Sequence, residues 1–155
     1  MQIKAEWSSP LLLRKSLSHN QIYEVDFDEL PNCPGVYVFC RRYAGKVVPI
    51  YIGQTLSLCR RIKGHLNSLP LMREIEHSPN GQKLLIYCTV HVNEERAKKQ
   101  IKIIEKALIL HAQTAGCVLF NKQGTRLPTD EINFTGNVTS QAFAPRVMRI
   151  KKALR

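Results

Sequence analysis

The chain has no pair of cysteines separated by two residues, and no apolar run of the roughly 18 residues that a membrane span requires. The segment Leu11-Leu12-Leu13 is too short for the apolar region of a signal peptide. The cysteines are odd in number and widely spread along the 155 residues: Cys33, Cys40, Cys59, Cys88 and Cys117. These absences exclude zinc ribbons and thioredoxin-like redox motifs. They predict a reduced, cytoplasmic protein without a membrane anchor.

Acidic residues are scarce as well. The chain has 12 Asp and Glu against 23 Lys and Arg, which gives a formal net charge of +11. Between Leu30 and Arg73 there is no acidic residue, whereas seven basic residues fall in that stretch: Arg41, Arg42, Lys46, Arg60, Arg61, Lys63 and Arg73. Such a distribution favours a phosphate backbone as partner, with DNA the first candidate and RNA the second. The alternative interpretation is a basic, solvated face with no partner.

A hydrophobic fraction of 44% is that of a globular protein, and the length fits one domain with short additions. The turn-forming residues around Pro31 and Pro34 separate an N-terminal lead-in, residues 1–32, from the core, residues 33–123. A basic extension, residues 124–155, follows. We expect it to pack on or beside the core, and its basic end is a candidate for gripping DNA. Nothing in the sequence decides the oligomeric state.

Two patterns of hydrophobic residues alternate within the core. Strands are predicted at 36–40, at 48–53 and, nearly all apolar and therefore central, at 84–92. Helices are predicted from Thr55 or Ser57 to about Asn67, over 69–75, and from an N-cap at Asn93 to about Thr114, before a stop at Gly116. The expected fold is α/β of the α+β type, a small three-stranded antiparallel sheet flanked by helices.

Several residues with chemical potential occur in a definite order. Two tyrosines stand in Gly35-Val36-Tyr37 and Tyr51-Ile52-Gly53, on the two arms of one predicted hairpin. The next helix carries Arg61 and His65 four residues apart, and therefore on one face. Glu105 lies beside the apolar stripe of the long helix, where a carboxylate is rare unless it is paired or bound to a cation. It could also be a boundary residue that reaches solvent or bridges to Lys102. Asn121 follows this helix.

This order resembles the GIY-YIG nuclease family over about residues 33–123. The family pattern is matched in sequence by Gly35-Val36-Tyr37, Tyr51-Ile52-Gly53, Arg61, His65, Glu105 and Asn121. Two departures stand out. The gap between the two tripeptides, residues 38–50, is longer than is usual and implies a longer hairpin tip. Gln54 also stands where repair-type members often have lysine, which weakens a direct assignment as a repair nuclease.

The resemblance implies a metal-dependent endonuclease that hydrolyses phosphodiester bonds in DNA. It implies that Glu105 holds one Mg²⁺ or Mn²⁺ and that Arg61 binds the phosphate. Either Tyr37 or Tyr51 would activate water, with Tyr37 favoured. His65 would relay the proton or bind phosphate, and Asn121 would orient the backbone or a water. Arg60 competes with Arg61 for the arginine position, although the spacing to His65 favours Arg61.

The remaining predictions concern nucleic-acid binding and packing. The residues predicted to bind nucleic acid are Arg41, Arg42, Lys46, Arg60 and Lys63. Gly35 and Gly53 are expected to serve close packing and backbone freedom. Two alternatives to a DNA endonuclease remain. One is a non-catalytic nucleic-acid-binding module with the same fold. The other is a toxin- or defence-type nuclease that acts on RNA.

Overall fold

The computed structural model describes residues 2–18, 21–121, 129–136, 139 and 147–151 and divides the chain into two units, residues 1–121 and 122–155. The first unit is built on an antiparallel sheet whose long strands are β5 (Gly35–Tyr43), β6 (Lys46–Thr55) and β7 (Gln82–Thr89). β5 lies between β6 and β7. The predicted α+β fold with a small antiparallel sheet is thereby confirmed. Two short strands from the lead-in, β1 (Glu6–Trp7) and β2 (Leu11–Leu12), pair with the outer edge of β7, so the sheet has five strands instead of three.

The β5–β6 hairpin turns through only two residues. Ala44 and Gly45 both have positive φ, 51° and 76°, and join Tyr43 to its partner Lys46. Two consecutive positive φ values are the signature of a type I′ turn, which matches the right-handed twist of the strands. The long gap between the two tripeptides therefore lengthens the two strands. The prediction of a longer hairpin tip is wrong, because the turn itself has only two residues.

A β-bulge interrupts β6 in the middle of the hairpin. Phe39 pairs with Tyr51 and Cys40 pairs with Pro49, so Ile50 is the additional residue. Proline cannot donate a ladder hydrogen bond and is tolerated at such a place on an edge strand. Because paired residues share a face and the register from Gly53 to Tyr51 is regular, Tyr51 lies on the same face of the sheet as its partner Phe39 and as Tyr37. Both tyrosines of the motif therefore face the same layer.

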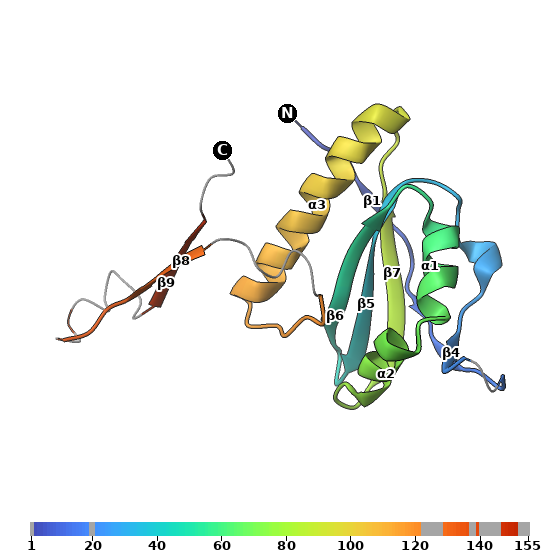
Figure 1. The fold of residues 1–155 in the computed structure, drawn as a ribbon, viewed down its shortest axis with the longest axis horizontal. Coiled ribbons are helices and arrows are strands. Elements are labelled where there is room, and N and C mark those ends of the chain that lie inside the picture. Colours follow the sequence, from blue (N-terminus) through green and yellow to red (C-terminus); the bar gives the residue numbers. More distant parts are fainter. Residues whose placement is uncertain (1, 19–20, 122–128, 137–138, 140–146, 152–155) are drawn as a thin grey trace. The chain divides into compact units, whose positions relative to one another are not determined.

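Helices cover both faces of the sheet (Figure 1). The helices α1 (Leu58–Leu66) and α2 (Leu69–His77) pack on the face that carries Tyr37, Phe39 and Leu85. The helix α3 (Glu94–Thr114) packs on the opposite face, against β6 and β5, over Val36, Val38 and Ile52. The side chain of Asn93 caps α3 by accepting a hydrogen bond from the backbone N–H of Arg96, as predicted. Because successive side chains of β5 point to opposite faces of the sheet, this strand contributes to two separate hydrophobic cores.

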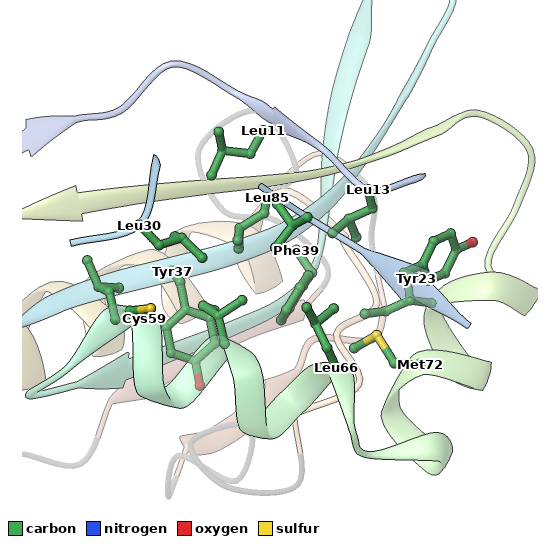
Figure 2. Close-up of a cluster of buried hydrophobic side chains, with 14 of the residues drawn as sticks. Leu11, Leu13, Tyr23, Leu30, Tyr37, Phe39, Cys59, Leu66, Met72 and Leu85 are labelled. Atoms are coloured by element: carbon green, nitrogen blue, oxygen red, sulfur yellow. The ribbon is translucent and has the colours of Figure 1, made fainter. Parts of the chain in front are cut away.

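The lead-in contributes to the first of these cores. After β2 the chain forms β3 (Arg14–Lys15), β4 (Tyr23–Glu24) and the 3₁₀-helix η1 (Phe27–Glu29). Figure 2 shows Leu11, Leu13, Tyr23 and Leu30 among the same buried side chains as Tyr37, Phe39 and Leu66. The segment that leads into the core is therefore packed beneath α1 and α2, because its apolar residues fill the space beside β7.

The second unit contains an antiparallel pair, β8 (Thr129–Asn133) and β9 (Val147–Lys151). The expectation that this extension packs on the core stays a prediction. Several of the basic residues of the extension lie outside the described residues. Within the described ranges, no helix combines the length and the apolar character needed to cross a membrane.

Candidate active site

The site is built around Tyr37, which is 1% exposed and lies at the centre of the sheet. Its direct partner across the hairpin is Gly53. A Cβ atom at position 53 would collide with the hydroxyl and ring of Tyr37, so the tyrosine lies across the backbone of β6 at the one place where no side chain obstructs it. Gly53 is therefore required by close approach and not by a special φ value. The prediction that this glycine serves packing agrees with this geometry.

The hydroxyl of Tyr37 links two residues of α1. Its oxygen lies 2.5 Å from Nε2 of His65 and 3.5 Å from Nε of Arg61. Burial raises the pKa of Tyr37 to about 12, although Arg61 opposes the shift. Burial, assisted by the charge of Arg61, lowers the pKa of His65 to about 4. At neutral pH the tyrosine is therefore protonated and the imidazole neutral, so the Tyr37 hydroxyl donates to His65 and accepts a long contact from Arg61.

Three aromatic rings hold His65 in place. The ring centroids of Tyr37, Tyr51 and Phe39 lie 5.3, 5.5 and 6.0 Å from the centroid of the imidazole. Tyr51 is half-buried and stacks on Tyr37 with the centroids 6.3 Å apart. Burial raises the pKa of Tyr51 too, against the charge of Arg61. This enclosure is the physical reason why His65 resists protonation, because a charged imidazole would lose its hydration here.

Glu105 approaches this group from α3. The carboxylate is half-buried, and burial raises its pKa while Lys106 and Arg61 lower it. The electrostatic interaction of Glu105 with Tyr37, Tyr51 and Arg61 places it within the range of all three. Within the described part of the chain it forms no hydrogen bond or ion pair, and the bridge to Lys102 is not formed. The structure thus brings the two tyrosines, the arginine and the histidine into contact, and Glu105 interacts with both tyrosines and the arginine electrostatically.

Asn121 acts on the backbone of the edge strand. Its Oδ1 accepts a hydrogen bond of 3.0 Å from the N–H of Ile52, and its Nδ2 donates to the carbonyl oxygen of the same residue. The neighbouring N–H of Phe120 donates to the carbonyl of Ile50 at 2.9 Å. The side chain of Asn121 therefore takes the place of a further strand along β6. Both hydrogen bonds are with the backbone of Ile52, and the role of Asn121 that the resemblance implied stays a prediction.

Comparisons with known proteins found one relevant solved structure. It is the GIY-YIG N-terminal endonuclease domain of UvrC from Thermotoga maritima, a tyrosine-to-phenylalanine point mutant bound to the catalytic divalent cation. The sequences are 27% identical, the match covers 56% of this chain and 84% of that one, and the TM-score is 0.39. The chain is similar to a GIY-YIG endonuclease domain. No family model matches the sequence, and no curated protein matches it.

A pocket of about 500 Å³ opens beside the motif residues. It is formed where β6 passes into α1, and its lining residues are Thr55, Leu56, Ser57, Arg60, Arg61, Gly64 and His65. Two of them, Arg60 and Arg61, carry positive charge, and none is acidic. Arg60 and Arg61 are both exposed and both border the pocket, but only Arg61 contacts Tyr37.

The predicted nucleic-acid-binding residues fall into two separate groups. Arg60 and Lys63 lie on α1, and Lys63 stands 5.1 Å from the centre of the Phe27 ring. Arg41, Arg42 and Lys46 lie instead at the far end of the hairpin. There Arg41 donates to the carbonyl of Asn80 at 3.2 Å and Arg42 donates to the side chain of Gln82 at 3.0 Å. At about 3.3 Å per residue, the hairpin tip is on the order of 20 Å from Tyr37.

Two residues at the site, Phe39 and Gly64, were not predicted from the sequence. Phe39 supports His65, and its position two residues after Tyr37 on the same strand was the available signal. Gly64 borders the pocket from within α1, and a glycine in a helix interior was the signal there. Gly35, by contrast, was expected to serve packing. A Cβ at that position would lie 2.6 Å from the carbonyl oxygen of Cys88 and 2.7 Å from Leu58, so Gly35 lets α1 approach the sheet.

Proposed function

We propose that this protein is a metal-dependent endonuclease that hydrolyses phosphodiester bonds in DNA. The observation that carries the proposal is the position of the Tyr37 hydroxyl, which lies between Nε2 of His65 and Nε of Arg61. A buried hydroxyl held between a neutral base and a permanent cation can lose a proton and remain stabilised. This is the requirement for activating water next to a phosphate.

The proton moves in one direction through this group. Tyr37 with a pKa of about 12 is a poor base by itself, and it becomes one only if its own proton leaves as it receives another. His65 is neutral and already accepts that proton at 2.5 Å. Tyr37 therefore takes a proton from water while it passes its own to His65. This arrangement favours Tyr37 as the residue that contacts water and Tyr51 as a partner that stacks on it.

Arg61 binds the phosphoryl group. Its Nε faces Tyr37, and its two terminal nitrogens have no hydrogen bond within the part of the chain that the structure describes. A guanidinium presents these donors in a planar fork that fits two phosphate oxygens. Charge that develops on the phosphoryl oxygens during the reaction would therefore be neutralised beside the activated water.

Glu105 fits a hydrated cation held by a single carboxylate. The described residues contain no group of three or more His, Cys, Asp or Glu that could enclose an ion. Mg²⁺ needs no such cage, because it commonly binds one or two carboxylates together with waters and substrate phosphate. Glu105 is half-buried, forms no hydrogen bond or ion pair among the described residues and interacts electrostatically with Arg61, which is compatible with such a ligand. The ion would stabilise the leaving oxygen as a Lewis acid.

Nicking of supercoiled plasmid in Mg²⁺ or Mn²⁺ tests the proposal. Wild type should nick the plasmid and EDTA should stop it. Glu105→Gln should lower the rate about 10²-fold or more, a loss typical of removing one group that stabilises the transition state. The matched control is Glu95→Gln, the same change at an exposed position of α3, which should leave the rate unchanged.

Two outcomes contradict the proposal. The proposed endonuclease activity is wrong if the wild-type protein cleaves no duplex, single-stranded or branched DNA with either cation. If the Glu105→Gln variant is as active as the Glu95→Gln control, the Glu105 carboxylate is not part of the active site. Parallel assays on RNA address the alternative of a toxin- or defence-type nuclease, because faster cleavage of RNA than of DNA would change the assigned substrate.

A further inference from the structure

Gly64 is an unexpected residue at its position in α1. Glycine in a helix interior is destabilising relative to alanine, because it loses more backbone freedom on folding. Nothing lies within 4 Å of a Cβ placed at position 64, and its φ is outside the left-handed region. Neither packing nor backbone conformation within the described chain thus calls for a glycine. This distinguishes it from Gly35 and Gly53, where a Cβ would meet neighbouring atoms.

The space in front of Gly64 is the pocket beside the site. Gly64 lines it together with Arg60, Arg61 and His65 of α1 and with Leu56, which lies two residues before the helix. The two hydroxyl groups of the lining are already used, since Thr55 bonds to the backbone of Ser57 and Ser57 bonds to Asn32. What the pocket offers a ligand is therefore positive charge, one partly exposed leucine and a bare stretch of helix.

Arg60 is available to bind such a ligand. Its side chain is exposed and has no hydrogen bond or ion pair in the part of the chain that the structure covers. Arg61 next to it is turned to Tyr37 through Nε. Two neighbouring guanidiniums on one wall, of which only one touches the Tyr37 hydroxyl, suit two successive phosphates of a single strand.

We propose that this pocket receives the nucleotide next to the scissile phosphodiester. Its sugar lies against Gly64, where a side chain would obstruct it, and its second phosphate lies on Arg60. The inference rests on the proposed nuclease function, since Arg61 holds the scissile phosphate. It adds a subsite for polynucleotide strands, with Gly64 as the residue that sets how closely the backbone approaches the helix.

Gly64→Ala separates this role from a structural one, because the two predict opposite outcomes. The substitution should raise Tm by about 2–4 °C through better helix propensity. It should also weaken binding of a fluorescent 12-nucleotide strand about tenfold, measured by anisotropy in EDTA so that no cleavage occurs. Gly64→Leu should weaken binding further. A raised Tm shows that the fold is intact.

The second arm of the experiment removes the cation. Arg60→Gln should weaken binding of strands of any sequence and lower the slope of log Kd against log salt by about 1. Lys98→Gln, the same loss of charge at an exposed position of α3, is the matched control and should change neither.

The outcomes keep the two proposals apart. If wild type nicks plasmid and Gly64→Ala has a raised Tm with unchanged binding and unchanged nicking, the subsite is wrong and the nuclease function stands. If wild type binds the strand in a manner that depends on Gly64 and Arg60 but never cleaves, the subsite stands and the nuclease function falls. If wild type neither binds nor cleaves, both are overturned.

Discussion

The hydroxyl oxygen of Tyr37 lies 2.5 Å from Nε2 of His65, and neither group carries a charge at neutral pH. The shared proton stays on Tyr37, because the pKa of its hydroxyl lies well above that of the imidazole, and it passes to His65 only when Tyr37 receives another proton. The same burial that keeps the tyrosine protonated keeps the imidazole unprotonated, so the direction of transfer is built into the fold. Stability and activity at low pH both depend on this pair.

The pH dependence of stability is the first prediction. The pKa of His65 is about 4 in the folded protein, below its ordinary value of 6.5. The unfolded chain therefore binds more protons between these values, and stability is fully present above pH 6.5 and is lost as the pH falls toward 4. The loss attributable to His65 is at most about 3 kcal/mol. Urea unfolding from pH 4.5 to 7.5 should show it in wild type but not in His65→Gln.

The control for this prediction is His77→Gln. The side chain of His77 is 75% exposed and lies 3.9 Å from Glu76, so the same substitution there removes an exposed imidazole without touching the buried group around Tyr37. Parallel pH profiles for wild type and His65→Gln would show that His65 is protonated equally in the folded and unfolded chain.

The second prediction distinguishes the two tyrosines. Tyr37→Phe removes the hydroxyl that contacts both His65 and Arg61, and it should lower the nicking rate by about 10²–10⁴-fold with little change in DNA binding. Tyr51→Phe keeps the stacked ring and should lower the rate much less. Rates and Kd values for both variants decide the matter. A larger loss of rate in Tyr51→Phe would transfer the role of base to Tyr51.

The sequence predicted the residues of this site better than their arrangement. The order of tyrosines, arginine, histidine and glutamate was visible because strand and helix periodicities are local. The strand register that puts Tyr51 on the face of Tyr37, and the placement of Asn121 along β6, depend on pairings between segments that are separate in the sequence. The positions of the basic residues in the sequence did not show how they are grouped in space. Arg41, Arg42 and Lys46 lie near Tyr37 in the sequence, but an extended hairpin carries them away from it.

Gly53→Ala gives the third prediction. The new Cβ would collide with the Tyr37 hydroxyl, so the ring must move and its contacts with His65 and Arg61 must lengthen. We expect a loss of stability of about 1–3 kcal/mol from overpacking, and a loss of nicking close to that of Tyr37→Phe. The double variant Gly53→Ala/Tyr37→Phe should lose little more activity than Tyr37→Phe. Additive losses would show that Gly53 acts independently of the tyrosine.

Asn121 provides the fourth prediction. Its side chain is 8% exposed and satisfies both the N–H and the carbonyl of Ile52. Asn121→Ala should lower the free energy of unfolding by about 2–3 kcal/mol, because two backbone groups of β6 lose their partner. Asn121→Asp keeps the acceptor and should lose less. Hydrogen exchange locates the effect, and faster exchange at the Ile52 amide is expected. Unchanged exchange there would show that the contact with Asn121 does not stabilise the edge strand.

The last prediction concerns the tip of the hairpin and tests the fold without touching the site. Ala44 adopts a φ of 51°, in the left-handed region, where asparagine is better tolerated than alanine. Asn-Gly is the preferred pair for a type I′ turn, so Ala44→Asn should stabilise the protein by about 0.5–1 kcal/mol. Urea unfolding measures the gain, and plasmid nicking should stay at the wild-type rate because the turn is distant from Tyr37. A loss of stability would mean that the two-residue turn is not formed, and the pairing of Tyr43 with Lys46 would have to be revised.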